Sequence, residues 1–105
     1  MATIKVNSVT CVRLQDSVVG KDELKVYIGG VEMAGPFGIG KGQTVKLNTA
    51  PKTFTGATTI QLREMDGNNY TSLGLRAITD SPVNSVSVNF DAAKNAFYTV
   101  SYTVA

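Results

Sequence analysis

The stretch SVSVNFDAAKNAFYTVSYTV, residues 85–104, decides the fold class. Apolar and small polar residues alternate on both sides of the turn residues 91–95, and a period of two is typical of a strand that buries one face. Two such segments around a short polar turn predict an antiparallel β-hairpin. Tyr98 and Tyr102 share one face of the second segment, where we expect them to pack in the core; a platform for stacking sugars is the alternative.

Similar alternating segments recur through the rest of the chain, separated by glycine, proline, asparagine and aspartate. We predict strands over residues 3–14, 24–28, 31–33, 43–47, 58–63 and 73–78. In the first of them the alternation slips near Asn7, and a bulge there would bring the apolar residues back to one face. These residues are Ile4, Val6, Val9 and Cys11. Gly29 and Gly30 predict a hairpin turn, because both of its central positions need positive φ.

About eight short strands without a convincing helix predict one all-β domain over residues 1–105, an eight-stranded antiparallel β-sandwich. The composition favours the same class, because 43% of the residues are hydrophobic and only 17% are charged. Such a balance is typical of strands that carry Ser, Thr and Asn at the surface. The single cysteine, Cys11, excludes an internal disulfide, and we expect it to face the core.

The net charge of +2 comes from scattered basic residues without a run of Lys or Arg, so the sequence does not support binding to nucleic acid. No stretch approaches the roughly 20 apolar residues of a membrane span, and the start of the chain lacks the apolar segment of a signal peptide. We therefore expect no transmembrane segment and a cytoplasmic location, with release by a non-classical route left open. The chain has no histidine, and a buried cysteine is a poor nucleophile, so we expect no enzyme activity.

The glycine-rich stretch GPFGIGKG, residues 35–42, nearly matches a phosphate-binding loop. Gly42 stands where that loop requires a magnesium-binding hydroxyl, and strand-like residues follow where a helix must begin, which excludes a nucleotide site. We predict an irregular loop that carries the apolar pair Phe37 and Ile39. The pair either contacts a protein or lipid partner or plugs the end of the sandwich.

The stretch TIQLREMDGNNYTSLG, residues 59–74, carries the candidate site. Its strand ends in Glu64 and Asp66, which point the same way if the strand continues, and Gly67 with the two asparagines after it forms a tight turn. Carboxylate, amide and carbonyl oxygens are ligands for a hard cation, so this loop predicts half of a calcium site. The alternative is that the Asp and Asn side chains only bond to nearby backbone amides in turns.

Four features of the sequence occur together. They are Cys11 at the end of the first strand, the loop 16–23 running into LKVYI at 24–28, the strand end Glu64-Met65-Asp66 with Leu73-Gly74 after it, and the terminal YTVSY at 98–102. Together they resemble C2-type β-sandwiches, especially the small bacterial and fungal C2-like modules. The resemblance covers nearly the whole chain and implies calcium held between the loops at one end of a C2-like sandwich.

Carried over to this chain, the resemblance implies calcium ligands on two loops. The implied ligands are Asp16, Asp22, Glu64 and Asp66, with Asn68 and Asn69 as additional ones. The final acid of the family pattern is missing, since Thr71 and Ser72 stand where it is expected. Because calcium affinity depends on the number of charged oxygens, we expect weak binding.

We therefore expect a non-enzymatic binding module in which calcium bridges the protein to an anionic lipid, a glycan or another protein. One alternative is a structural protein that self-assembles into a homo-oligomer through its edge strands, without a bound ion. Another alternative is a small lectin-like or toxin-like protein.

Overall fold

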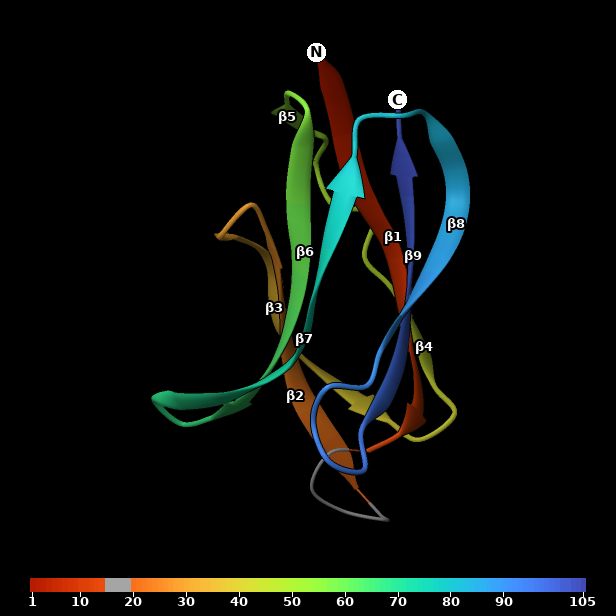
Figure 1. The fold of residues 1–105 in the computed structure, drawn as a ribbon. Helices are drawn as coiled ribbons and strands as arrows, with labels where there is room; N and C mark the ends of the chain where they lie inside the picture. Colours follow the sequence, from red (N-terminus) through yellow and green to blue (C-terminus); the bar gives the residue numbers. More distant parts are fainter. Residues whose placement is uncertain (15–19) are drawn as a thin grey trace.

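The computed structural model describes residues 1–14 and 20–105, which form two antiparallel sheets packed face to face (Figure 1). The first sheet is built from β1 (Ala2–Arg13), β4 (Thr44–Lys46), β5 (Lys52–Phe54), β8 (Val83–Phe90) and β9 (Phe97–Val104). The second sheet is built from β2 (Lys21–Ile28), β3 (Val31–Gly40), β6 (Ala57–Asp66) and β7 (Asn69–Thr79). These ranges confirm the all-β prediction, and they contain nine strands where the sequence predicted eight.

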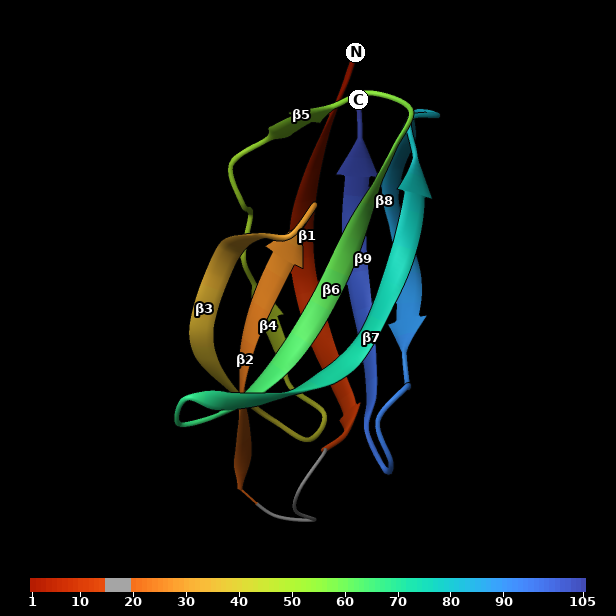
Figure 2. The ribbon, with the colours of Figure 1, turned by 60° about the vertical axis from the view of Figure 1, so that its left-hand side comes forward.

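Both sheets place sequence-distant strands side by side. The order in the first sheet is β4-β1-β9-β8. β5 pairs with the same edge of β1 as β4 does, but nearer the N-terminal end of β1. The order in the second sheet is β3-β2-β6-β7. Figure 2 shows the second sheet in front of the first, with β6 and β7 running almost its whole height.

The bulge predicted in β1 is confirmed. The pairing of β1 with β9 shifts register between Val6 and Ser8, and one extra residue restores the alternation of inward and outward side chains. Asn7 donates a hydrogen bond from Nδ2 to Thr103 Oγ1 at 3.1 Å. The four residues expected on one face, Ile4, Val6, Val9 and Cys11, are all buried.

The two predicted hairpins are also confirmed. β8 and β9 pair antiparallel, with Phe90 opposite Tyr98 next to the turn. Gly29 and Gly30 connect β2 to β3 with φ angles of 58° and 80°. Glycine adopts positive φ without the Cβ clash that other residues suffer, which is why this pair makes a two-residue turn.

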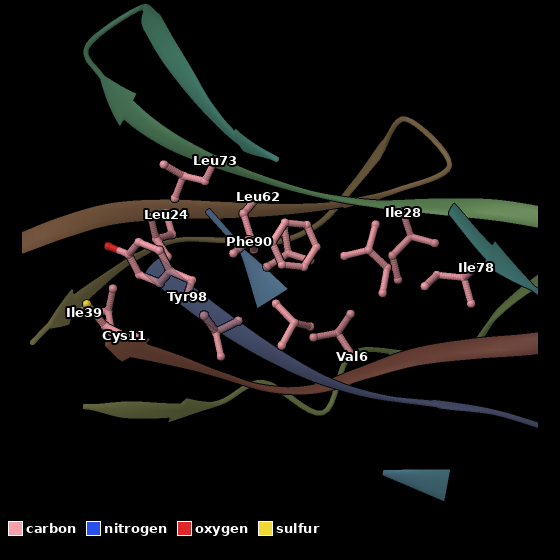
Figure 3. Packing of buried hydrophobic residues seen from close by; sticks show 14 of the residues in the cluster. Val6, Cys11, Leu24, Ile28, Ile39, Leu62, Leu73, Ile78, Phe90 and Tyr98 are labelled. Carbon is pink, nitrogen blue, oxygen red and sulfur yellow. The ribbon is translucent and has the colours of Figure 1, made fainter. Parts of the chain in front are cut away.

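The core lies between the two sheets and consists of the inward-facing side chains of both (Figure 3). Its largest fully buried members include Tyr98, Phe90, Ile4, Leu24, Ile28, Ile39, Ile60, Leu62 and Leu73. Each apolar side chain of this size contributes roughly 1.5–3 kcal/mol when it leaves water. Cys11 is among the buried residues, as predicted.

The glycine-rich stretch after the Gly29–Gly30 turn is a strand, where the sequence predicted a loop. β3 continues to Gly40 and pairs with β2 as far as Lys21, with register shifts between Leu24 and Tyr27 that accommodate the irregular backbone. Ile39 is fully buried in the core, and Phe37 is partly buried against it. Ile39 therefore packs in the core and Phe37 against it, and contact of the pair with a partner stays a prediction.

The outer end of the β6–β7 hairpin bends away from the core. In Figure 1 it projects from the second sheet on the side opposite the first, and in Figure 2 it crosses β2. The pairing of these strands shifts register between Leu62 and Arg63, and a bulge bends the strand that contains it. The bend gives the second sheet a concave outer face.

A substitution at Gly35 tests how closely β3 packs on β2. A Cβ at Gly35 would lie 2.5 Å from the Leu24 carbonyl oxygen, whereas a Cβ at Gly30 would meet nothing within 4 Å; both glycines have positive φ. We expect Gly30→Ala to lower the free energy of unfolding by about 1 kcal/mol through backbone strain alone. Gly35→Ala adds overpacking and should cost about 2 kcal/mol more. Urea unfolding measures both, and equal losses would contradict this packing.

Candidate functional site

Two of the predicted acids lie inside the protein. Asp22 is the second residue of β2 and Glu64 lies near the end of β6, and their exposed fractions are 2% and 6%. Glu64 is opposite Leu24 in the sheet, so Asp22, two residues from Leu24, is its diagonal neighbour on the inner face. The structure therefore brings these two carboxylates to the same end of the core, where the sequence predicted exposed loops.

The hydroxyl of Tyr98 satisfies the buried carboxylate of Asp22. It donates a hydrogen bond to Asp22 Oδ2, and the buried Cys11 side chain lies beside the same tyrosine. Burial, followed by the contact with Asp22, holds the pKa of Tyr98 far above its ordinary value, and burial raises the pKa of the Cys11 thiol. Figure 3 shows Tyr98 beside Cys11 and Leu24, with its hydroxyl pointing away from Phe90.

The predicted ligands after Glu64 do not share the buried position of this pair. Asp66, Asn68 and Asn69 are exposed at the tip of the bent hairpin, and Asp16 lies outside the described residues. The predicted strand stopped at Arg63, with Glu64 and Asp66 after it; instead β6 continues to Asp66, which leaves Glu64 on the buried face of a strand. Within residues 1–14 and 20–105, no three His, Cys, Asp or Glu side chains form a group that could hold a metal ion.

An arginine held between two tyrosines occupies the outer face of the second sheet. The Arg63 Cζ atom lies 3.9 Å from the ring centre of Tyr27 and 4.1 Å from that of Tyr70. Arg63 also donates from Nε to Gln61 Oε1 at 2.9 Å, and Gln61 donates to Ser72 Oγ at 3.0 Å. These contacts come from β2, β6 and β7 and fix the guanidinium in one orientation. We call Tyr27, Arg63 and Tyr70 the arginine stack.

A cleft of about 250 Å³ lies on the outer face, beside this stack. The residues that line it are Glu23, Lys25, Pro36, Met65 and Gly67. They come from β2, from β3 and from the end of the β6–β7 hairpin, so the bend of the hairpin forms one wall. Lys25 lies directly opposite Arg63 in the sheet, and Met65 lies opposite Tyr70. The arginine stack therefore borders the cleft.

The cleft is lined by one cation, Lys25, and one carboxylate, Glu23, and Arg63 and Glu32 lie on either side of Lys25. Lys25 Nζ is 3.0 Å from Glu32 Oε1, and this contact raises the pKa of the Lys25 ammonium. Arg63 forms no salt bridge with any carboxylate of the described residues. Like charges opposite each other in a sheet repel, and here the two rings and Glu32 offset that repulsion. Arg63 is thus a rigid cation next to an open cavity.

This site was not predicted from the sequence. Tyr27 and Arg63 alternate with the apolar residues Val26, Ile28 and Leu62 of their strands, and this alternation, which turns them outward, was the available signal. The neighbourhood of the two residues depends on the β2–β6 pairing, and the pairing of β6 with β7 contains a register shift. The alternation of residues within one strand predicts neither the β2–β6 pairing nor the register shift between β6 and β7.

No protein-family model matches the chain, and no curated protein matches its sequence significantly. Among the residues that the structure describes, none belongs to a helix with the length and apolarity needed to cross a bilayer. The function must therefore be inferred from the chemistry of the chain's own side chains.

The buried Tyr98 hydroxyl should make stability fall at alkaline pH. An unfolded tyrosine loses its proton near pH 10, while Tyr98 in the folded chain keeps its proton because its pKa is raised. Above about pH 10 the unfolded state binds fewer protons, so the free energy of unfolding decreases as the pH rises. Tyr98→Phe should lose about 1–3 kcal/mol at pH 7, since Asp22 loses its donor, and should decline less above pH 10.

Urea unfolding between pH 7 and pH 11 measures both effects. Tyr102→Phe is the matched control, because the Tyr102 side chain is only partly buried. A decline above pH 10 that is equally steep in the wild type and in Tyr98→Phe would contradict the assignment.

The calcium hypothesis stays a prediction, and melting temperature tests it. If Asp66 and the other predicted acids hold an ion in the native state, calcium at about ten times its Kd adds about 1.4 kcal/mol of stability. Asp66→Asn should reduce that gain, and magnesium serves as the control ion. An unchanged melting temperature at about ten millimolar calcium, roughly ten times the Kd of the weakest protein sites, would end the hypothesis.

Proposed function

We propose that the protein is a non-enzymatic binding module that takes an anionic group of its ligand into the cleft beside Arg63. The observation that carries the proposal is the arginine stack. Arg63 is fixed between two rings at 3.9 and 4.1 Å and has no carboxylate partner among the described residues. A guanidinium that is already oriented loses little entropy on binding, and its planar N–H groups match carboxylate and phosphate oxygens.

The surrounding residues support an anion at this place. Lys25 lies directly across from Arg63 and adds a second positive charge. Its present partner, Glu32, is a half-exposed carboxylate, which an incoming anion can replace. Pro36 and Met65 supply apolar walls, and a concave site with a few convergent polar groups is the usual form of a binding pocket.

The described side chains favour binding over catalysis. The chain has no histidine, and its one thiol, Cys11, is buried with a raised pKa. A thiol in that state is mostly protonated at neutral pH and reacts slowly. Of the partners expected from the sequence, an anionic lipid, an acidic glycan or a protein with an exposed carboxylate would offer such an anionic group. The C2-like type of the sandwich remains a proposal alongside it.

Simple anions test the proposed function. We expect acetate and inorganic phosphate, titrated at low salt, to shift the NMR signals of Lys25, Arg63 and Tyr70 in a saturable way. Arg63→Gln should weaken this binding at least about fivefold, because it removes a charge-assisted hydrogen bond. Added sodium chloride should weaken binding in the wild type, since salt screens exposed charges.

Arg76→Gln is the matched control, because Arg76 is also exposed on the second sheet but pairs with Asp91 at 3.5 Å, away from the cleft. This variant should bind anions as the wild type does. Shifts spread over all basic residues, or shifts that survive in Arg63→Gln, would overturn the proposal.

A further inference from the structure

The geometry of Arg63 restricts the shape of the anion. The Arg63 Cζ atom lies 3.9 Å and 4.1 Å from the ring centres of Tyr27 and Tyr70, so two rings restrict the approach to the guanidinium, and its Nε–H is already donated to Gln61. Only the terminal N–H groups in the guanidinium plane remain for a ligand. A flat acceptor with two oxygens fits that edge, and a carboxylate is such an acceptor.

The charges of the cleft restrict the number of negative charges on the ligand. Glu23 lines the cavity, and Glu32 lies 3.0 Å from Lys25. A dianion such as phosphate would be repelled by both carboxylates. A monoanion with neutral hydroxyl groups avoids this cost, because Glu23 can accept hydrogen bonds from hydroxyls while Lys25 donates them.

The walls and size of the cleft indicate a ring with an apolar face. Pro36 and Met65 line the cavity, and Tyr70, opposite Met65, is 48% exposed. An exposed phenol ring offers a flat apolar surface with a polar edge. The volume of about 250 Å³ is below that of pockets for drug-sized ligands, roughly 300–1,000 Å³. One ring-sized unit fits, and the open side lets a longer chain continue.

We propose that the ligand is a carboxylated sugar, a hexuronic acid unit of an acidic glycan, with its carboxylate on Arg63 and Lys25 and its hydroxyls toward Glu23. This inference rests on the proposed function and names the ligand class of the same cleft. The ring of the sugar lies against Met65 and the exposed part of Tyr70.

Glucuronic acid and glucose form the matched pair of probes, because they differ only in the carboxylate. We expect glucuronate to bind at least about tenfold more tightly than glucose, acetate or inorganic phosphate, as measured by calorimetry and NMR shifts at the cleft. Arg63→Lys should lose roughly tenfold in glucuronate affinity, because an ammonium cannot bind a carboxylate with two parallel hydrogen bonds. Tyr70→Ser should weaken glucuronate binding more than acetate binding, since only glucuronate has a sugar ring that contacts Tyr70.

Two further variants separate folding from binding. Glu32→Gln should strengthen glucuronate binding about threefold, because it frees Lys25. Arg76→Gln, remote from the cleft, should leave it unchanged, and the melting temperature of every variant shows whether it folds.

Each contrary result has a distinct meaning. Glucose binding as tightly as glucuronate would remove the role of the carboxylate and overturn the inference. Acetate or phosphate binding at the cleft as tightly as glucuronate would overturn the sugar assignment while the anion-binding cleft stands. If none of the four probes shifts the signals of Arg63, both the inference and the proposed function are wrong.

Discussion

The antiparallel register of β2 and β6 is the constraint on which both the core and the cleft depend. In this register Leu24 lies opposite Glu64 on the inner face, and Lys25 lies opposite Arg63 on the outer face. A slip of one residue would turn the side chains of one strand to the opposite face and bring either Lys25 or Arg63 toward the core. The burial of Leu24 and Val26, both with no exposed surface, therefore also fixes the pair of cations on the surface.

The outer faces of the two sheets differ in how their cations are placed. On the first sheet, neutral side chains bond to one another across strands, as Thr10 does with Thr44 at 2.7 Å and Asn7 with Thr103 at 3.1 Å. Those polar groups are satisfied within the protein and gain little from a ligand. On the second sheet, Arg63 lies against two rings and next to the cleft that Lys25 lines. This arrangement, and not the lack of a salt bridge alone, is why we place ligand binding on the second sheet.

Features that depend on a few neighbouring residues could be predicted from the sequence. The bulge near Asn7 follows from a slip in the alternation of one strand, and the turn at Gly29 and Gly30 follows from their tolerance of positive φ. The hairpin of β8 and β9 follows from a clean period of two. In each of these cases the residues that determine the structure are adjacent in the chain.

Features that depend on register between distant strands could not be predicted. Glu64 was placed on an exposed turn, because nothing in its own strand shows that β6 runs on to Asp66 and pairs with β7 up to that residue. The arginine stack needs β2, β6 and β7 in one alignment, including the register shift after Leu62. The loop predicted over residues 35–42 was wrong for the same reason. Glycine has a low strand propensity, but pairing with β2 holds this segment as part of β3.

Because Cys11 is buried, the reactivity of its thiol measures how often the core around β1 opens. The thiol has no exposed surface, and it is the only one in the sequence. A thiol reagent can reach it only when β1 separates from its neighbours, so the rate of alkylation measures how often this part of the core opens. For the same reason, cross-linking of folded molecules through this sulfur is blocked unless the sandwich first comes apart.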